Sequence, residues 1–217
     1  MQALSSRYKI LFTDRQYRFS FVLAVFMLLL SLLANSNAIT YATEKASNSV
    51  TDVVLDNVPL VDVDGISVYG PILLWLIVAF LCLQEPKRFP FVMKSLALFI
   101  TIRCVFVSLT HIGPFADQVH ILGNLSWIQK LTYGGDLFFS GHTGSPFLMA
   151  LVFFQSRKLF TFFTGTAMFF GIIVLLAHLH YTIDVLSAFF ITYSIYKISE
   201  YIFTDDRKML METLPGT

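Results

Sequence analysis

Charged residues are scarce in this sequence. Asp, Glu, Lys and Arg make up only 13% of its 217 residues, whereas 56% are hydrophobic and the mean hydropathy is +0.70. Soluble globular domains carry about 25% charged residues. The composition therefore excludes an ordinary soluble domain.

The chain also has little excess charge of either sign, few cysteines and no repeats. A formal net charge of +1 offers no basic surface for a phosphate backbone, so nucleic acid is not an expected partner. Cys82 and Cys104 both lie in apolar stretches, which favours buried side chains over a disulfide or a thiolate metal site. The lack of internal repeats, low-complexity tracts and long linkers favours one bundle.

Six apolar runs of about 20 residues, the length that crosses a bilayer core, lie between the charged clusters. Because backbone polar groups in lipid must be satisfied within the segment, each run is predicted to be a helix. We expect an all-α polytopic membrane protein, a bundle of six transmembrane helices with short outer-face loops. The expected spans are residues 19–39, 66–83, 91–110, 137–155, 159–177 and 181–203. They form one catalytic membrane domain, 19–203, between an N-terminal segment, 1–18, and a C-terminal tail, 204–217.

The basic residues predict the orientation of these spans. Twelve of the fifteen Lys and Arg residues lie on one side, and only Lys45 and Lys130 lie on the other. Positively charged loops stay in the cytoplasm, so we expect both termini there, in a multi-pass protein of the cell membrane. The first run, with small residues at 34–38, also resembles a secretory signal; that alternative leaves the remaining topology unchanged.

The two outer loops show weak patterns. Alternation of apolar and polar residues at 60–64 predicts a short strand or hairpin over the bundle mouth. Apolar residues at helical spacing between 115 and 127 predict an interfacial helix.

Four ionisable residues stand out within the expected spans or at the start of one, where each costs roughly 2.5 to 3.5 kcal/mol on insertion scales. Arg103, His142, His180 and Asp184 all fall in the outer third of the membrane. His180 and Asp184, four residues apart, are predicted to share one helix face and to form a hydrogen bond. Such a carboxylate would fix the tautomer of the histidine and stabilise its positive form, although it could also serve only to satisfy a buried histidine.

Residues 135–143 indicate an anion site at the start of the fourth span. Ser140 and Gly141 would let a phosphate approach the helix start, and His142 would stand beside it as a proton donor. Arg103 could add a bidentate contact to the same phosphate, or it could snorkel or pair with a structural Asp.

The other histidines suggest no metal site. His178 would point away from the face of His180, and His111 and His120 are expected to be ordinary solvated loop residues. Because the histidines lack a tight ligand spacing, we expect no metal and no cofactor.

Together these residues carry a family resemblance. Asp136 with Ser-Gly-His-Thr at 140–143, followed by Ala-His-Leu-His-Tyr-Thr-Ile-Asp-Val at 177–185, resembles the sphingomyelin synthase branch of the type 2 phosphatidic acid phosphatase (PAP2) superfamily. The likeness covers about residues 50–203. It includes Arg103-Cys104 and, more faintly, the segment from Asp52 to Asp56.

The resemblance implies transfer of a phospho-headgroup from a glycerophospholipid to a ceramide or diacylglycerol hydroxyl at the outer face. It makes His180 the nucleophile, Asp184 its orienting partner and His142 the acid and base, acting through a phosphohistidine. The substrate-binding residues that it implies are Arg103, Asp136, Ser140, Gly141, Tyr181, Asp52 and Asp56.

The chain departs from the wider superfamily in its cations. Lys94 and Arg103 are more widely spaced than in the Lys-x6-Arg-Pro box of the phosphatases, and Ile173-Val174 replaces a Ser-Arg pair. Fewer cations favour a singly charged diester over a dianionic monoester. The alternatives are a phospholipase C-like or lipid phosphate phosphatase hydrolase that uses the same residues with water as acceptor, and a non-catalytic scaffold or transporter.

Overall fold

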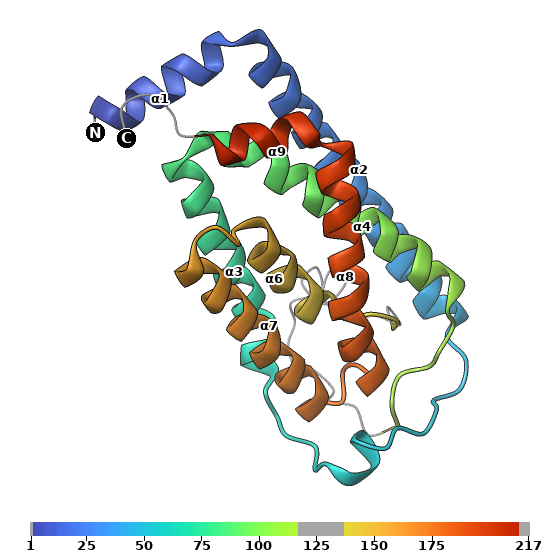
Figure 1. Cartoon of the computed structure of the whole chain (residues 1–217). Helices are drawn as coiled ribbons and strands as arrows, with labels where there is room; N and C mark the ends of the chain where they lie inside the picture. The colour runs from blue at the N-terminus through green and yellow to red at the C-terminus, as the bar shows by residue number, and fades with distance from the viewer. Residues whose placement is uncertain (1, 117–136, 213–217) are drawn as a thin grey trace.

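The chain folds into helices joined by irregular segments (Figure 1). This computed structural model describes residues 2–116 and 137–212, and within these ranges it contains helices but no strand, so the all-helical expectation is confirmed for this part of the chain. The α-helices are α1 (Gln2–Thr13), α2 (Arg15–Lys45), α3 (Asp64–Gln84), α4 (Phe89–Leu109), α6 (Gly141–Val152), α7 (Arg157–Leu176), α8 (Thr182–Ile202) and α9 (Thr204–Met211). Two 3-10 turns, η1 (Leu55–Asn57) and η2 (Pro86–Arg88), lie between them.

Among the described residues, 4 helices are long and apolar enough to cross a membrane. They are Arg15–Lys45, Gly65–Gln84, Pro86–Leu109 and Arg157–Leu176. These helices are those of an integral membrane protein. The expected count of six spans is not confirmed, and neither are the short outer loops.

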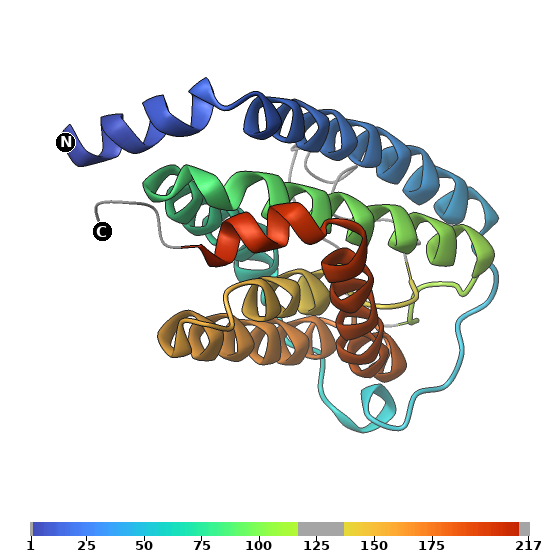
Figure 2. The same cartoon turned by 45° about the horizontal axis from the view of Figure 1, so that its top comes forward.

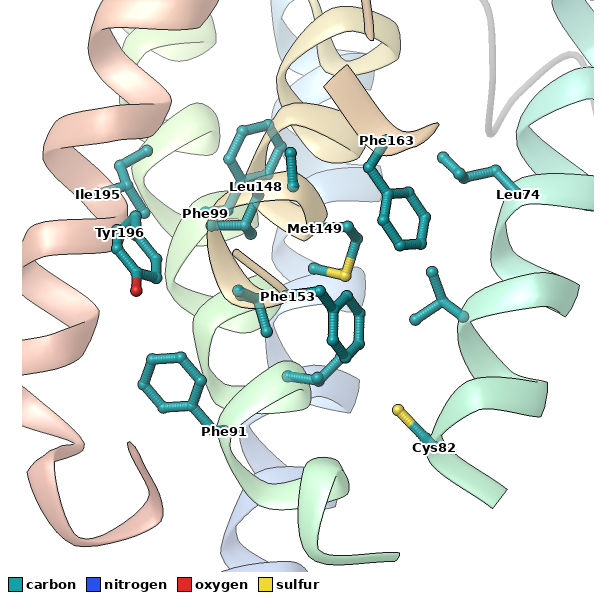
Figure 3. Packing of buried hydrophobic residues seen from close by; sticks show 14 of the residues in the cluster. Leu74, Cys82, Phe91, Phe99, Leu148, Met149, Phe153, Phe163, Ile195 and Tyr196 are labelled. Atoms are coloured by element: carbon teal, nitrogen blue, oxygen red, sulfur yellow. The ribbon is translucent and has the colours of Figure 1, made fainter. Parts of the chain in front are cut away.

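The fourth expected span, 137–155, contains a much shorter helix. α6 has 12 residues, which at 1.5 Å per residue is about 18 Å, well short of a hydrocarbon core of roughly 30 Å. The residues before it, Phe138 and Phe139, have positive φ angles of 102° and 40° and so cannot extend the helix. The apolar run is nevertheless explained, because Leu148 and Met149 are fully buried among neighbouring helices (Figure 3).

The sixth expected span is a helix of sufficient length with a mixed composition. α8 has 21 residues, but it contains Asp184, Lys197 and Glu200. It is not among the four helices that are long and apolar enough to cross a membrane.

The helices form two packed groups connected by α8. α2 lies along α4, and α6 packs against α7, while α8 contacts both α4 and α6 (Figures 1 and 2). Successive helices alternate in direction, so the bundle has two ends. We call the end with segments 46–63, 110–116, 137–140 and 177–181 the loop end, and the end with residues 85–88, 153–156 and 203–211 the terminal end.

The expected strand at 60–64 is wrong. Residues 60–63 are irregular and α3 begins at Asp64. The amide of Val61 donates to the carbonyl of Leu176 at 2.9 Å, and Val63 packs against the small cluster around Val174. The alternating pattern thus reflects a loop laid against α7 rather than a sheet.

The terminal end is held by a buried polar network. The Lys94 ammonium group donates to Oδ2 of Asp206 at 2.6 Å and to Oγ of Ser20 at 2.7 Å. Ser20 also donates to Oδ1 of Asp206. This network joins α2, α4 and α9, so part of the expected tail, 204–217, belongs to the packed structure.

The orientation of the bundle stays a prediction, and cysteine labelling tests it. Val53 at the loop end is 85% exposed, and Arg157 at the start of α7 is exposed. We expect a membrane-impermeant maleimide to label Val53→Cys in intact cells, and Arg157→Cys only after permeabilisation. The native cysteines are buried, so the wild type gives the background. Labelling of position 157 alone in intact cells would reverse the assigned topology.

The buried ion pair at the terminal end predicts that substitutions of two adjacent aspartates change the stability of the protein by different amounts. Asp206→Asn leaves the Lys94 charge buried with a weakened partner and should destabilise the protein by about 3 kcal/mol or more. Asp205→Asn is the matched control, because Asp205 lies 3.9 Å from Lys208 and its side chain is 75% exposed. Thermal unfolding in detergent micelles measures both. Equal melting temperatures for the two variants would show that the network contributes little.

Candidate functional site

His180 and Asp184 form a hydrogen bond at the loop end of the bundle. Nδ1 of His180 lies 3.2 Å from Oδ2 of Asp184, and the two residues are 5% and 0% exposed. The expected contact is therefore present, but its geometry differs from the expected one. His180 precedes α8 instead of lying on it, and the contact forms because Asp184 turns back toward the helix start.

Asp184 turns back because it caps α8. It occupies the third helical position, and its Oδ2 also accepts the backbone amide of Tyr181 at 3.1 Å, within a capping box. Its backbone carbonyl accepts the amide of Ser140 at 3.0 Å. Its Oδ1 is buried and has no hydrogen-bond partner within the described part of the chain. Asp184 thus orders the start of α8, orients His180 and holds Ser140, the residue directly before α6.

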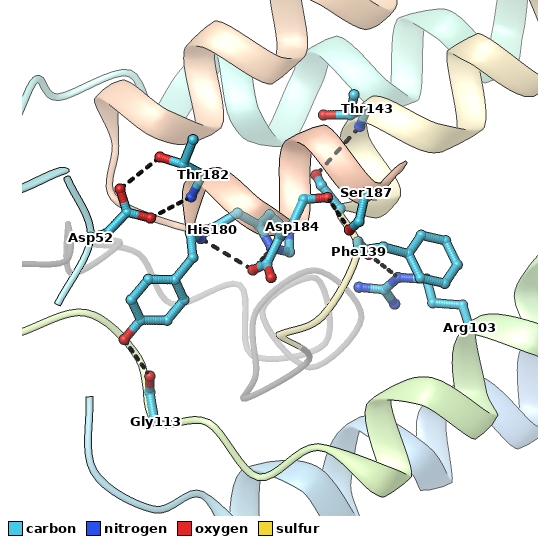
Figure 4. A network of polar contacts seen from close by, with 11 residues as sticks. Asp52, Arg103, Gly113, Phe139, Thr143, His180, Thr182, Asp184 and Ser187 are labelled. Atoms are coloured by element: carbon cyan, nitrogen blue, oxygen red, sulfur yellow. Dashed lines mark hydrogen bonds and ion pairs between the residues drawn. The ribbon is translucent and has the colours of Figure 1, made fainter. Parts of the chain in front are cut away.

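Contacts from the segments 46–63 and 110–116 also hold the start of α8 (Figure 4). Oδ2 and Oδ1 of Asp52 accept the amide and hydroxyl of Thr182 at 2.6 and 2.7 Å. The hydroxyl of Tyr181 donates to the carbonyl of Gly113 at 2.9 Å and accepts the amide of Val50 at 3.2 Å. Both loops are therefore tied to the segment that carries His180.

These contacts give three of the expected substrate-binding residues a positioning role. Asp52 and Tyr181 hold loops to α8, and Asp56 accepts the amide of Asp52 at 3.1 Å. Contact of Asp52, Asp56 or Tyr181 with a substrate stays a prediction.

The second histidine of the expected site comes from α6. The ring centroids of His142 and His180 are 6.4 Å apart, close enough for both rings to serve one phosphoryl group. Nε2 of His142 lies 3.1 Å from the carbonyl oxygen of Ser67 in α3. The structure therefore brings His142, His180 and Asp184 together, and their catalytic roles remain predictions.

Arg103 lies against the start of α6. It is 7% exposed, and its Nε donates to the carbonyl of Phe139 at 3.4 Å. A Cβ atom at Gly141 would lie 3.3 Å from that Nε and 3.5 Å from Cζ. Glycine at 141 therefore lets the guanidinium lie beside the helix start, where amides and the helix dipole favour an anion.

Ser140 is the N-cap of α6 rather than an open anion contact. It is fully buried, and its Oγ accepts the amide of Thr143 at 3.4 Å. Its own amide is used by Asp184. The expected anion site accordingly depends on the start of α6 and on Arg103 more than on the Ser140 hydroxyl.

Left-handed backbone conformations precede both histidines, and the sequence gives no signal for them. Phe138 and Phe139 have positive φ angles before α6, and His178 has a φ of 54° before α8. Phe139 is held in place by edge-to-face contacts with Phe99 and Phe106, at centroid distances of 5.5 and 6.0 Å. Such conformations are costly in bulky residues and persist only where packing fixes them.

The remaining expectations at this end have mixed outcomes. His178 is buried, with Nε2 3.1 Å from the carbonyl of Val58, as a structural histidine would be. His111 is half-buried and lies edge-on to Tyr41, so the expected solvated position is wrong. Asp136, His120 and the segment 117–127 of the expected interfacial helix lie outside the described residues.

The hydrogen bonds that Asp52 accepts from Thr182, here called the Asp52 clamp, predict an effect of pH on the loop end. Burial alone would raise the pKa of Asp52, but hydrogen bonds from Thr182, Leu55 and Val54 outweigh burial and lower the pKa below its ordinary value. Because the folded pKa is lowered, the clamp stabilises the fold above the unfolded pKa of about 3.9. That contribution is lost as the pH falls through the folded pKa.

We expect Asp52→Asn to raise hydrogen exchange at residues 50–58 at neutral pH, as strong acid should do in the wild type. Asp56→Asn is the matched control, because Asp56 contacts only its own loop in the described structure. Unchanged exchange in Asp52→Asn would show that the loop does not depend on this carboxylate.

The comparisons with known proteins concern the same residues. Residues 134–201 match the family model of the PAP2 superfamily C-terminal domain. The match covers well under half of the chain, includes His142, His180 and Asp184, and supports membership of the PAP2 superfamily. No curated protein and no solved structure matches the chain. The match indicates phosphoester chemistry on lipid substrates.

Proposed function

We propose that this chain is a membrane lipid phosphotransferase of the sphingomyelin synthase type. It would move a phosphocholine or phosphoethanolamine headgroup from a glycerophospholipid to a ceramide or diacylglycerol hydroxyl. One observation carries the proposal: a buried histidine bonded to a carboxylate lies 6.4 Å, between ring centroids, from a second histidine. That arrangement supplies a nucleophile and a proton carrier to one phosphorus atom.

In the first half of the reaction, Nε2 of His180 attacks the phosphorus atom. The Nδ1–H group of His180 donates a hydrogen bond to the Asp184 carboxylate and keeps its proton, so Nε2 carries the lone pair. The bond from phosphorus to the diacylglycerol oxygen breaks, and that oxygen takes a proton from His142. A phosphohistidine that bears the headgroup results, and the Asp184 carboxylate stabilises its positive ring.

In the second half, His142 takes the proton of the acceptor hydroxyl. The acceptor oxygen attacks phosphorus, the phosphorus–nitrogen bond breaks, and its electron pair returns to Nε2 of His180. Arg103 and the start of α6 would stabilise the negative phosphoryl oxygens in both halves.

The distribution of buried cations favours a diester substrate. Lys94 is paired with Asp206 at the terminal end, and Arg207 is paired with Glu200 there. Among the buried residues of the described structure, Arg103 is thus the one cation at the loop end. A singly charged phosphodiester needs less compensation at that position than a dianionic monoester.

Hydrolysis is the second candidate function. The family match at 134–201 contains the same two histidines and aspartate, and water could replace the lipid hydroxyl in the second half of the reaction. The protein would then act as a phospholipase C-like enzyme or as a lipid phosphate phosphatase.

Lipid products decide between these functions. Purified protein would be reconstituted in vesicles of labelled phosphatidylcholine or phosphatidylethanolamine, with and without ceramide or diacylglycerol, and in parallel with phosphatidic acid. Transfer predicts a new headgroup-bearing lipid that requires the acceptor. Water-soluble phosphocholine or phosphoethanolamine formed without acceptor would indicate a phospholipase, and inorganic phosphate from phosphatidic acid would indicate a phosphatase. No product from folded protein would favour a scaffold or transporter.

The assigned roles predict distinct effects for three substitutions. His180→Ala should abolish turnover. His142→Ala should stop departure of the leaving group. Asp184→Asn should lower kcat on the order of a hundredfold, less than the ~10⁴-fold loss in a serine protease triad, because Arg103 and the helix start still stabilise charge.

Trapping the phosphohistidine intermediate shows which histidine is the nucleophile. With a headgroup-labelled donor and no acceptor, the wild type and the control His111→Ala should carry an acid-labile radiolabel. The label should vanish in His180→Ala. If it persists there, His180 is not the nucleophile.

A further inference from the structure

The contact between His142 and α3 fixes the position of a proton. A carbonyl oxygen can only accept a hydrogen bond, so the 3.1 Å contact with Ser67 requires the proton on Nε2 of His142. In the neutral ring, Nδ1 is then the basic nitrogen. The Ser67 carbonyl therefore selects the tautomer of His142.

The Ser67 carbonyl is available because of a proline. In an α-helix the carbonyl of residue 67 would accept the amide of residue 71, but residue 71 is Pro71, which lies inside α3 and has no amide hydrogen. The proline ring also crowds the carbonyl four residues before it and tilts that carbonyl away from the helix axis. Because Ser67 is fully buried, its carbonyl would be costly to leave without a donor. The His142 ring supplies that donor.

A close helix contact brings this turn of α3 toward the site. A Cβ atom at Gly70 would lie 2.5 Å from Cε1 of Phe170 in α7. The Phe170 ring in turn lies edge-on to His142, with centroids 6.3 Å apart. Ser67, Pro71 and His142 thus meet where α3, α6 and α7 converge.

We propose that Pro71 is a positioning residue that acts on His142 through the Ser67 carbonyl. Its missing amide leaves an acceptor that holds the proton on Nε2, so that Nδ1 is the atom that exchanges a proton with the lipid oxygens. This catalytic consequence rests on the proposed function. The tautomer itself does not.

The partners of the two histidines differ in a way that suits their tasks. His180 is held by a carboxylate, whose charge stabilises the positive ring of a phosphohistidine. Nε2 of His142 instead faces a neutral carbonyl, which orients the ring from that nitrogen. A ring that gives up a proton and takes one back in each cycle needs a fixed orientation, and the carbonyl supplies it at Nε2.

Pro71→Ala tests the proposal, because it restores an amide that competes for the Ser67 carbonyl. The net worth of one hydrogen bond predicts a roughly three- to tenfold shift in the ratio of His142 tautomers and a similar fall in kcat with KM unchanged. The tautomers are read from ring nitrogen-15 shifts of the full-length protein in micelles, with the His142 signal assigned by His142→Gln. The kcat is measured with phosphatidylcholine as donor and diacylglycerol as acceptor.

Two further variants make the result specific. Pro71→Val restores the same amide with a bulkier side chain and should behave as Pro71→Ala does. Ile72→Ala is the matched control, because Ile72 is 45% exposed on the same turn and already has its amide. It should change neither the tautomer ratio nor kcat.

The outcomes separate the two proposals. An unchanged tautomer ratio in Pro71→Ala and Pro71→Val, or a matching shift in Ile72→Ala, would overturn the role of Pro71 whatever the activity. A shifted ratio in a protein that neither transfers nor hydrolyses lipid headgroups would support the positioning role and overturn the proposed function. A shifted ratio with unchanged kcat would show that the proline sets the tautomer but not the rate, and would overturn its role in catalysis.

Discussion

The need to satisfy backbone polar groups in an apolar interior governs this structure. A continuous helix satisfies its own amides and carbonyls, so free backbone polar groups are available only where a helix begins, ends or is broken. The candidate site uses three such places: the start of α8 at Asp184, the start of α6 at Gly141, and the turn of α3 where Pro71 lacks an amide. Each orients a side chain that the proposed chemistry needs.

Asp184 is the residue on which most of the site depends. Its carboxylate caps α8 and orients His180, while its carbonyl holds the amide before α6. A contact that orients His180 and also caps a helix is held by the stability of the fold. The same coupling ties two segments of the loop end to the site, because Asp52 bonds Thr182 at the start of α8 and Tyr181 bonds Gly113.

The sequence predicted the helical class and the meeting of His142, His180 and Asp184, because apolar length and residue spacing are local signals. It did not predict how they meet. The expected i, i+4 face is instead a capping contact, and the fourth span is a short buried helix preceded by left-handed residues at Phe138 and Phe139. Apolar runs in lipid and in a packed interior look alike, so hydropathy alone could not separate a spanning helix from α6. Tertiary aromatic contacts decide the backbone at Phe139, and no pattern within the segment encodes them.

The two buried basic residues of α4 lie at opposite ends of the bundle and serve different purposes. A buried cation without a partner is costly, so each must be paired or must await a charged ligand. Lys94 is committed to Asp206 and cannot also serve a phosphate at the far end of α4. Arg103, on the same helix, lies beside the start of α6 with a backbone carbonyl as a partner. One end of α4 thus carries a basic residue in a structural ion pair, and the other end carries a basic residue beside a helix start, where amides and the helix dipole favour an anion. The helix therefore separates a basic residue that holds the fold together from one that lies at the candidate site, and the two cannot exchange roles.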